Sequence, residues 1–129
     1  MGDQTHRVLL VEDYEDSRVL YTEYLESLGY EVDTAADGVE ALTKAREAPP
    51  DIIVLDLALP RMDGWELARE LRKDARTSRI CIIAATGHGG EPYVARAFDS
   101  GCDEVLVKPL EPAMLRERIE RALFVRRTG

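Results

Sequence analysis

Residues 52–64 have the sequence IIVLDLALPRMDG, and this stretch contains the clearest indication of the fold. It begins with an apolar run rich in β-branched side chains, which is typical of a short parallel strand covered on both faces. A carboxylate, Asp56, follows that run directly. Further on, Asp63 and Glu66 have capping-box spacing ahead of an apolar helical pattern. The stretch therefore predicts a buried strand that ends in an acid, then a loop, then a helix with Asp63 as its cap.

The same alternation of short apolar runs and amphipathic segments continues along the chain. Strand-like runs occur at residues 7–11 (RVLLV), 80–84 (ICIIA) and 105–107 (VLV), and a more polar run at 31–35 (EVDTA) fits an edge strand. Between them, apolar residues recur at helical spacing in five segments, for example Leu20, Tyr24 and Leu28, or Leu115, Ile119 and Leu123. Five strand–helix units in strict alternation predict an α/β fold with a parallel sheet and helices on both faces.

The composition fits one acidic domain. The chain has 129 residues, 17 Lys and Arg against 25 Asp and Glu, a net charge of −8 and 45% apolar residues. We expect a single domain at residues 1–129 with its core at about 6–125. The acidic balance argues against direct nucleic-acid binding. No apolar run approaches the roughly 20 residues of a membrane span, and no signal-peptide core is present, so we expect a cytoplasmic protein without membrane insertion.

Polar residues follow the expected strands where each strand ends. Glu12 and Asp13 follow the first, Asp56 the third and Thr86 the fourth, and the fifth ends at Lys108. In such sheets a ligand binds outside the carboxyl ends of the strands. Three neighbouring carboxylates repel one another unless a cation enters, and Mg²⁺ suits oxygen ligands and phosphate partners. A carboxylate beside Mg²⁺ can act as a nucleophile towards phosphorus, so the set predicts phosphoryl transfer.

Four sequence blocks resemble the receiver domain of bacterial two-component response regulators, of the chemotaxis-regulator type. The blocks are Val11-Glu12-Asp13, Leu55-Asp56 with Pro60-Arg61-Met62-Asp63-Gly64, Ala84-Ala85-Thr86-Gly87, and Lys108-Pro109. They occur in the family's order and spacing, each at the end of an expected strand. The resemblance covers about residues 6–125 and implies a flavodoxin-like, doubly wound sheet of five parallel strands in the order 2-1-3-4-5.

The resemblance also implies which residues hold the phosphoryl group and the metal. Asp56 would be the phospho-acceptor and a metal ligand. Asp13 would bind Mg²⁺ directly, Glu12 would act through water, and the backbone carbonyl of Ala58 would complete the protein ligands. Free Mg²⁺ is the one cofactor implied.

The remaining implied roles belong to the fourth and fifth strand ends. Thr86 would move to hydrogen-bond the phosphoryl group, and Lys108 would pair with it, next to a cis Lys108–Pro109 peptide. Val105 stands where the family often has Tyr or Phe, and a valine has no ring to rotate. We therefore expect output through the loop after Thr86 or through a different response of the fourth helix. We also hypothesise that His88 affects hydrolysis of the aspartyl phosphate, while the small Ala58 leaves water access open.

The resemblance implies a phosphorylation-switched signalling module rather than an enzyme. A sensor histidine kinase or a histidine phosphotransfer protein would supply the phosphoryl group. The chain ends soon after its fifth helix, so we expect no output domain of its own, and the signal would pass to a separate downstream protein.

Two other functions meet specific objections in the sequence. A phosphatase of the haloacid-dehalogenase type needs a second acid two residues after its nucleophile, where this chain has Ala58. A flavodoxin-like electron carrier needs a Ser/Thr/Gly-rich phosphate loop after its first strand, where this chain has the acidic residues 12–16 (EDYED). Steady turnover of a phosphate ester would favour the first, and a coloured purified protein the second.

Overall fold

Strands and helices alternate along the chain, as the sequence predicts. The computed structural model describes residues 5–87 and 89–128. Its elements are β1 (Arg7–Val11), α1 (Glu15–Ser27), β2 (Glu31–Ala35), α2 (Gly38–Glu47), β3 (Ile52–Asp56), α3 (Gly64–Lys73), β4 (Cys81–Thr86), α4 (Glu91–Asp99), β5 (Glu104–Val107) and α5 (Pro112–Thr128). The predicted strand at 80–84 differs most. Ile80 belongs to the preceding turn, where its N–H donates to Thr77, and the strand continues to Thr86 because Thr86 pairs with Val107.

The five strands form one parallel sheet in the order β2-β1-β3-β4-β5, which confirms the flavodoxin-like α/β fold. β2 lies at one edge, and Ala35 is its single buried residue, as expected of the polar run at 31–35. The strand order reverses between β1 and β3, where ligands bind in open sheets of this type. Val11 pairs with Leu55 across these two strands, so Glu12 and Asp56 follow at the same level.

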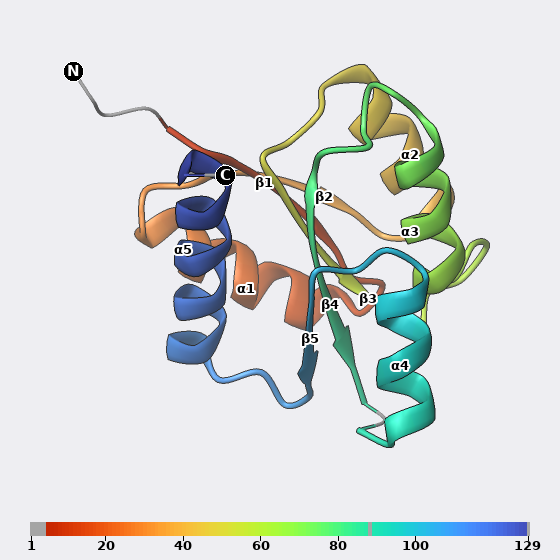
Figure 1. Cartoon of the computed structure of the whole chain (residues 1–129). Helices are drawn as coiled ribbons and strands as arrows, with labels where there is room; N and C mark the ends of the chain where they lie inside the picture. Colours follow the sequence, from red (N-terminus) through yellow and green to blue (C-terminus); the bar gives the residue numbers. More distant parts are fainter. Residues whose placement is uncertain (1–4, 88, 129) are drawn as a thin grey trace.

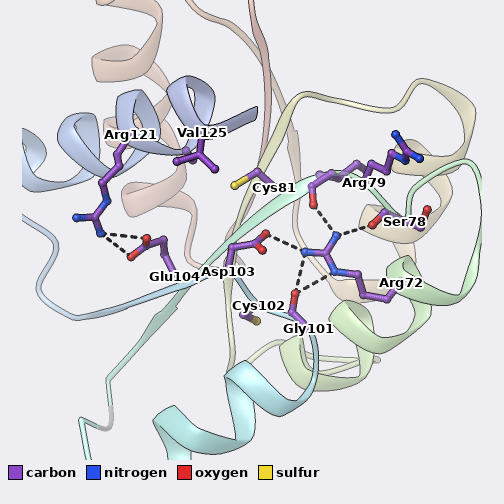
Figure 2. A pocket seen from close by; sticks show the side chains of 12 residues that line it. Arg72, Ser78, Arg79, Cys81, Gly101, Cys102, Asp103, Glu104, Arg121 and Val125 are labelled. Atoms are coloured by element: carbon purple, nitrogen blue, oxygen red, sulfur yellow. Dashed lines mark hydrogen bonds and ion pairs between the residues drawn. The ribbon is translucent and has the colours of Figure 1, made fainter. Parts of the chain in front are cut away.

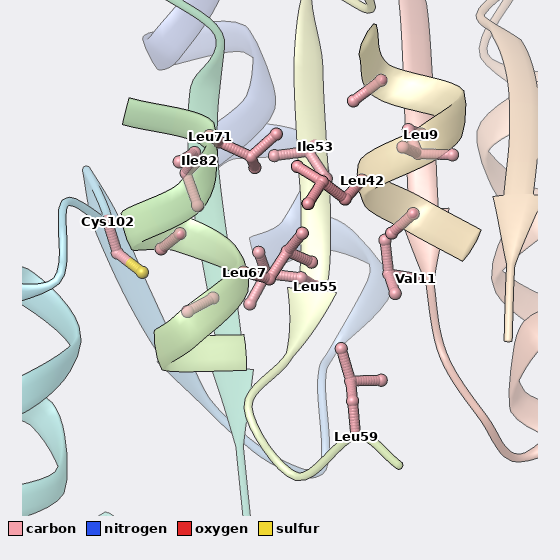
Figure 3. Close-up of a cluster of buried hydrophobic side chains, with 14 of the residues drawn as sticks. Leu9, Val11, Leu42, Ile53, Leu55, Leu59, Leu67, Leu71, Ile82 and Cys102 are labelled. Atoms are coloured by element: carbon pink, nitrogen blue, oxygen red, sulfur yellow. The ribbon is translucent and has the colours of Figure 1, made fainter. Parts of the chain in front are cut away.

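Two layers of helices cover the sheet. α1 and α5 lie against one face, and α2, α3 and α4 lie against the other (Figure 1). On the second face, Leu67 and Leu71 of α3 and Leu42 of α2 pack towards Ile53 and Leu55 of β3 (Figure 3). Each fully buried Leu or Ile contributes about 1.5–3 kcal/mol, so this packing fixes the helices against the strands. None of the helices, over the described residues, is both long and apolar enough to cross a membrane.

The start of α3 confirms the predicted cap. The Asp63 side chain accepts a hydrogen bond of 2.8 Å from the Glu66 N–H, as an N-cap does. The next residue, Gly64, lies very close to the end of β3. A Cβ atom at Gly64 would lie 2.6 Å from the Leu57 Cα atom and 2.7 Å from the Asp56 carbonyl oxygen. A residue without a side chain is therefore required where α3 meets the acidic end of β3.

Candidate functional site

Three carboxylates meet at the carboxyl ends of β1 and β3. Glu12 and Asp13 follow the last residue of β1, and Asp56 is the last residue of β3. One oxygen from each of the three lies within 4.8 Å of the others. Glu12 and Asp56 are buried, with 4% and 8% of their surface exposed, whereas Asp13 is exposed. This oxygen-only set, with one member open to solvent, has the donor chemistry and spacing of a site for a hard divalent cation.

Lys108 supplies the positive charge that this acidic pocket needs. Its Nζ atom donates to Asp56 Oδ2 at 2.7 Å and to Glu12 Oε1 at 3.0 Å. Burial alone would lower the pKa of the Lys108 ammonium, but the hydrogen bonds and charges of Asp56 and Glu12 outweigh it, so the pKa is raised. Lys108 therefore remains protonated and partly neutralises the two buried carboxylates.

The two oxygens of Asp56 have different partners. Oδ2 accepts from Lys108, and Oδ1 accepts a hydrogen bond of 3.0 Å from the Ala58 N–H. Together these bonds fix the plane of the carboxylate at the mouth of the pocket. Ala58 itself is exposed.

Thr86 ends the neighbouring strand β4. Asp56 pairs with Ala85, so Thr86 lies one residue beyond the level of the acid on the adjacent strand. Thr86 is buried, and its carbonyl accepts a hydrogen bond of 2.8 Å from the Lys108 N–H. The Lys108–Pro109 peptide is cis, as expected. The ends of β4 and β5 are thus connected beside the pocket.

Two other sequence-based expectations concern the surroundings of the pocket. Val105 is partly buried and packs against the cluster of α2, α3 and α4, so it occupies a core position. The hypothesis about His88 lies outside the described residues. The sequence pattern does not single out Arg18, whose Nη1 atom donates to the backbone carbonyl of Glu12 at 2.9 Å. No motif marks this residue, because its contact is with main-chain oxygen.

A hollow on the described structure lies away from these acids. It has a volume of about 750 Å³ and is lined by the amino-terminal ends of β4 and β5 and by α5. Figure 2 shows Arg72 reaching across it from α3 towards Gly101 and Asp103. The Arg72 guanidinium donates to the carbonyls of Gly101, Ser78 and Ile80 and to the Asp103 carboxylate, at 2.6 to 3.0 Å. Arg72 therefore connects the loops at the opposite end of the sheet from the acidic pocket.

The comparison with known families fits this geometry. A family model described as the response regulator receiver domain matches residues 8–120. The chain belongs to this family. As a receiver domain, it is a signalling module and not an enzyme with an external substrate. The expectation drawn from the four sequence blocks is confirmed, and the phosphatase and electron-carrier alternatives are set aside.

Individual relatives agree with the assignment. The receiver domain is 38% identical over 120 residues to the DNA-binding dual master transcriptional regulator RpaA of Synechocystis sp. (strain ATCC 27184 / PCC 6803 / Kazusa), covering 93% of this chain and 49% of that protein. It thus spans about half the length of the curated relatives it matches first. The structure of the chemotaxis response regulator CheY4 of Vibrio cholerae superposes with a TM-score of 0.87 at 33% identity, covering 92% of this chain and 99% of that one.

A third relative contains a metal ion. The receiver domain of the sensor histidine kinase PA1611 from Pseudomonas aeruginosa PAO1 has a magnesium ion coordinated in its active-site cleft. It superposes with a TM-score of 0.85 at 32% identity, covering 92% of this chain and 97% of that one.

Proposed function

We propose that this receiver domain accepts a phosphoryl group on Asp56 from a phosphohistidine, and that the modification changes its binding to a separate protein. The main support is the position of Asp56. Its carboxylate lies at the carboxyl end of β3, near two further acids, and the Lys108 Nζ atom is 2.7 Å from its Oδ2 atom. An acid used only to cap a helix needs no such surroundings.

The acidic residues fit Mg²⁺. Glu12, Asp13 and Asp56 provide hard oxygens at mutual distances below 4.8 Å, and we propose the Ala58 carbonyl as a further ligand. When bound, Mg²⁺ neutralises the carboxylates and the oxygens of an incoming phosphoryl group. The exposed Asp13 leaves one side of the site open to that group and to water.

The chain's own groups fit in-line phosphoryl transfer. One Asp56 oxygen forms a bond to phosphorus while the bond from phosphorus to the donor imidazole nitrogen breaks. The electron pair of that broken bond remains on the imidazole nitrogen, which takes up a proton from solvent. The Lys108 ammonium donates to the transferred phosphoryl oxygens, and the Thr86 hydroxyl provides a second hydrogen bond from the end of β4.

The need for a phosphohistidine limits which proteins could supply the phosphoryl group. Receiver domains are phosphorylated by histidine kinases, and we propose a sensor histidine kinase or a histidine phosphotransfer protein as donor, in the cytoplasm. We further propose that residues 1–129 act as one domain, because β1 to α5 share one sheet with a helical layer on each face. In this proposal the phosphorylated domain acts through binding to another protein.

The proposal is tested by incubating the protein with acetyl phosphate and Mg²⁺ and measuring the intact mass. The native chain should gain one phosphoryl group, and a chelator should abolish the gain. Asp56→Asn should gain nothing. The control is Asp63→Asn, which changes a nearby acid of the same loop and keeps a capping side chain. Equal labelling of Asp56→Asn and the native chain would refute the assignment.

A further inference from the structure

Arg18 contacts the main chain of the two residues that follow β1. Its Nη1 atom lies 2.9 Å from the Glu12 carbonyl oxygen and 3.4 Å from the Asp13 carbonyl oxygen. We propose that Arg18 is a positioning residue for the cation site, because it holds the turn between β1 and α1 so that the Glu12 and Asp13 carboxylates face the same ion. This inference rests on the proposed function.

The contact joins the turn to a fixed element. Arg18 lies in the first turn of α1, and its own N–H donates to the Tyr14 carbonyl at 3.0 Å. Its side chain then runs back to the carbonyls that precede the helix. Both contacts come from the Nη1 nitrogen, whose two N–H groups can donate to successive carbonyls, so one side chain restrains the turn at both residues.

The turn has few other side-chain supports. Tyr14 occupies the N-cap position of α1 without a side-chain cap hydrogen bond. The Glu12 carboxylate also contacts the turn, since its Oε2 atom accepts from the Tyr14 N–H at 3.1 Å while Oε1 accepts from Lys108. Within the described ranges, no hydrogen bond or ion pair reaches the Asp13 carboxylate. The orientation of Asp13 therefore depends on its backbone, which Arg18 holds.

Arg18 could act on a bound cation through its charge or through its hold on the turn, and these two effects on Mg²⁺ affinity have opposite signs. A guanidinium close to the pocket repels Mg²⁺, so a residue acting only through its charge would weaken binding. A residue acting through position strengthens binding by keeping the ligand oxygens together. Partners outside the ligand shell typically change metal affinity by about 10- to 100-fold when removed. The sign of the change on removing Arg18 therefore separates the two roles.

The test compares Mg²⁺ dissociation constants, measured by calorimetric titration, for the native chain, Arg18→Met and Arg18→Lys. The control is Arg116→Met, which removes one positive charge from an exposed pair with Glu120 on α5. We expect Arg18→Met to weaken Mg²⁺ binding about tenfold, Arg18→Lys to weaken it less, and Arg116→Met to leave it unchanged. In acetyl phosphate labelling, Arg18→Met should need more Mg²⁺ for half-maximal rate and should approach the native rate at saturation.

Each outcome has one meaning. The positioning role is overturned if Arg18→Met binds Mg²⁺ as tightly as the native chain or more tightly. It is also overturned if Arg18→Met loses maximal labelling rate while the Mg²⁺ dependence of that rate is unchanged. If Arg18→Met does not fold, Arg18→Lys decides, because the lysine side chain is one bond shorter and its ammonium falls short of the Nη1 position, so native-like Mg²⁺ affinity would contradict the positioning role. A native chain that binds no Mg²⁺ would instead count against the proposed function.

Discussion

The Lys108 ammonium lies 2.7 Å from Asp56 Oδ2, although 52 residues separate the two in the chain. The same nitrogen donates to Glu12, so one side chain bridges the carboxyl ends of the neighbouring strands β1 and β3. These contacts place one cation between two buried carboxylates. We therefore expect Lys108 to affect both the cation affinity of the pocket and the reactivity of Asp56.

Replacing Lys108 by Met should have opposite effects on metal binding and phosphorylation. Mg²⁺ should bind more tightly, because a competing positive charge leaves Glu12 and Asp56. The rate of labelling by acetyl phosphate should fall about 100-fold, because one donor to the transferred oxygens is lost. Calorimetric titration and timed intact-mass measurements check the two effects. Weaker Mg²⁺ binding in Lys108→Met would show that Lys108 organises the acids rather than competing with the metal.

Gly64→Ala should destabilise the fold. The new methyl group would lie 2.6 Å from the Leu57 Cα atom, so α3 or the end of β3 has to move. We expect a loss of about 2 kcal/mol in the free energy of unfolding, measured with urea. Gly87→Ala is the control, because among the described residues, leaving out Gly87 and its chain neighbours, no heavy atom lies within 4 Å of the position that its new methyl group would take. Equal stability of the two variants would contradict the close approach of α3 to β3.

Arg72→Met should be more destabilising than Arg79→Met, although both residues line the same hollow. Arg72 donates to three carbonyls and to Asp103, which in turn accepts from the Ile82 N–H. Its removal leaves partly buried acceptors without donors and should cost about 3 kcal/mol. Arg79 is exposed, and its replacement should change the free energy of unfolding by less than about 0.5 kcal/mol. Urea titration of both variants distinguishes these values.

Stability at high pH should depend on Cys102. Burial raises the pKa of the Cys102 thiol to about 12 from an ordinary value of 9.0, with Arg72 opposing the shift and Asp103 adding to it. The folded state thus holds the thiol proton more tightly than the unfolded chain. The resulting stability is present below pH 9 and is lost as the pH rises towards 12. Between about pH 8 and pH 10, native stability should fall more steeply than that of Cys102→Ala. Parallel slopes would contradict a raised thiol pKa.

The fold and the position of the acids were predictable from the sequence because they depend on pattern. Short apolar runs predicted the strands, and parallel strands bring Glu12 and Asp56 to one edge wherever the chain folds this way. The Asp63 cap was equally local, since donor and acceptor lie within one helical turn.

Contacts between distant side chains were not predictable in the same way. The Arg72 network joins α3 to loops that follow it by up to 31 residues, and no spacing rule links them. The contact of Arg18 with two carbonyl oxygens involves no partner side chain, so sequence pairing could not show it. The limits of β4 depended on pairing with β5, which moved the strand's end to Thr86.

The residue that carries the phosphoryl group can be identified chemically. After labelling with acetyl phosphate and Mg²⁺, borohydride reduction converts an aspartyl phosphate to homoserine, and tandem mass spectrometry of the peptides locates the modified residue. We expect homoserine at Asp56 alone, with Asp13, Glu12 and Asp63 unmodified. Homoserine at Asp13 or Asp63, or no conversion in a protein that has gained a phosphoryl group, would contradict it.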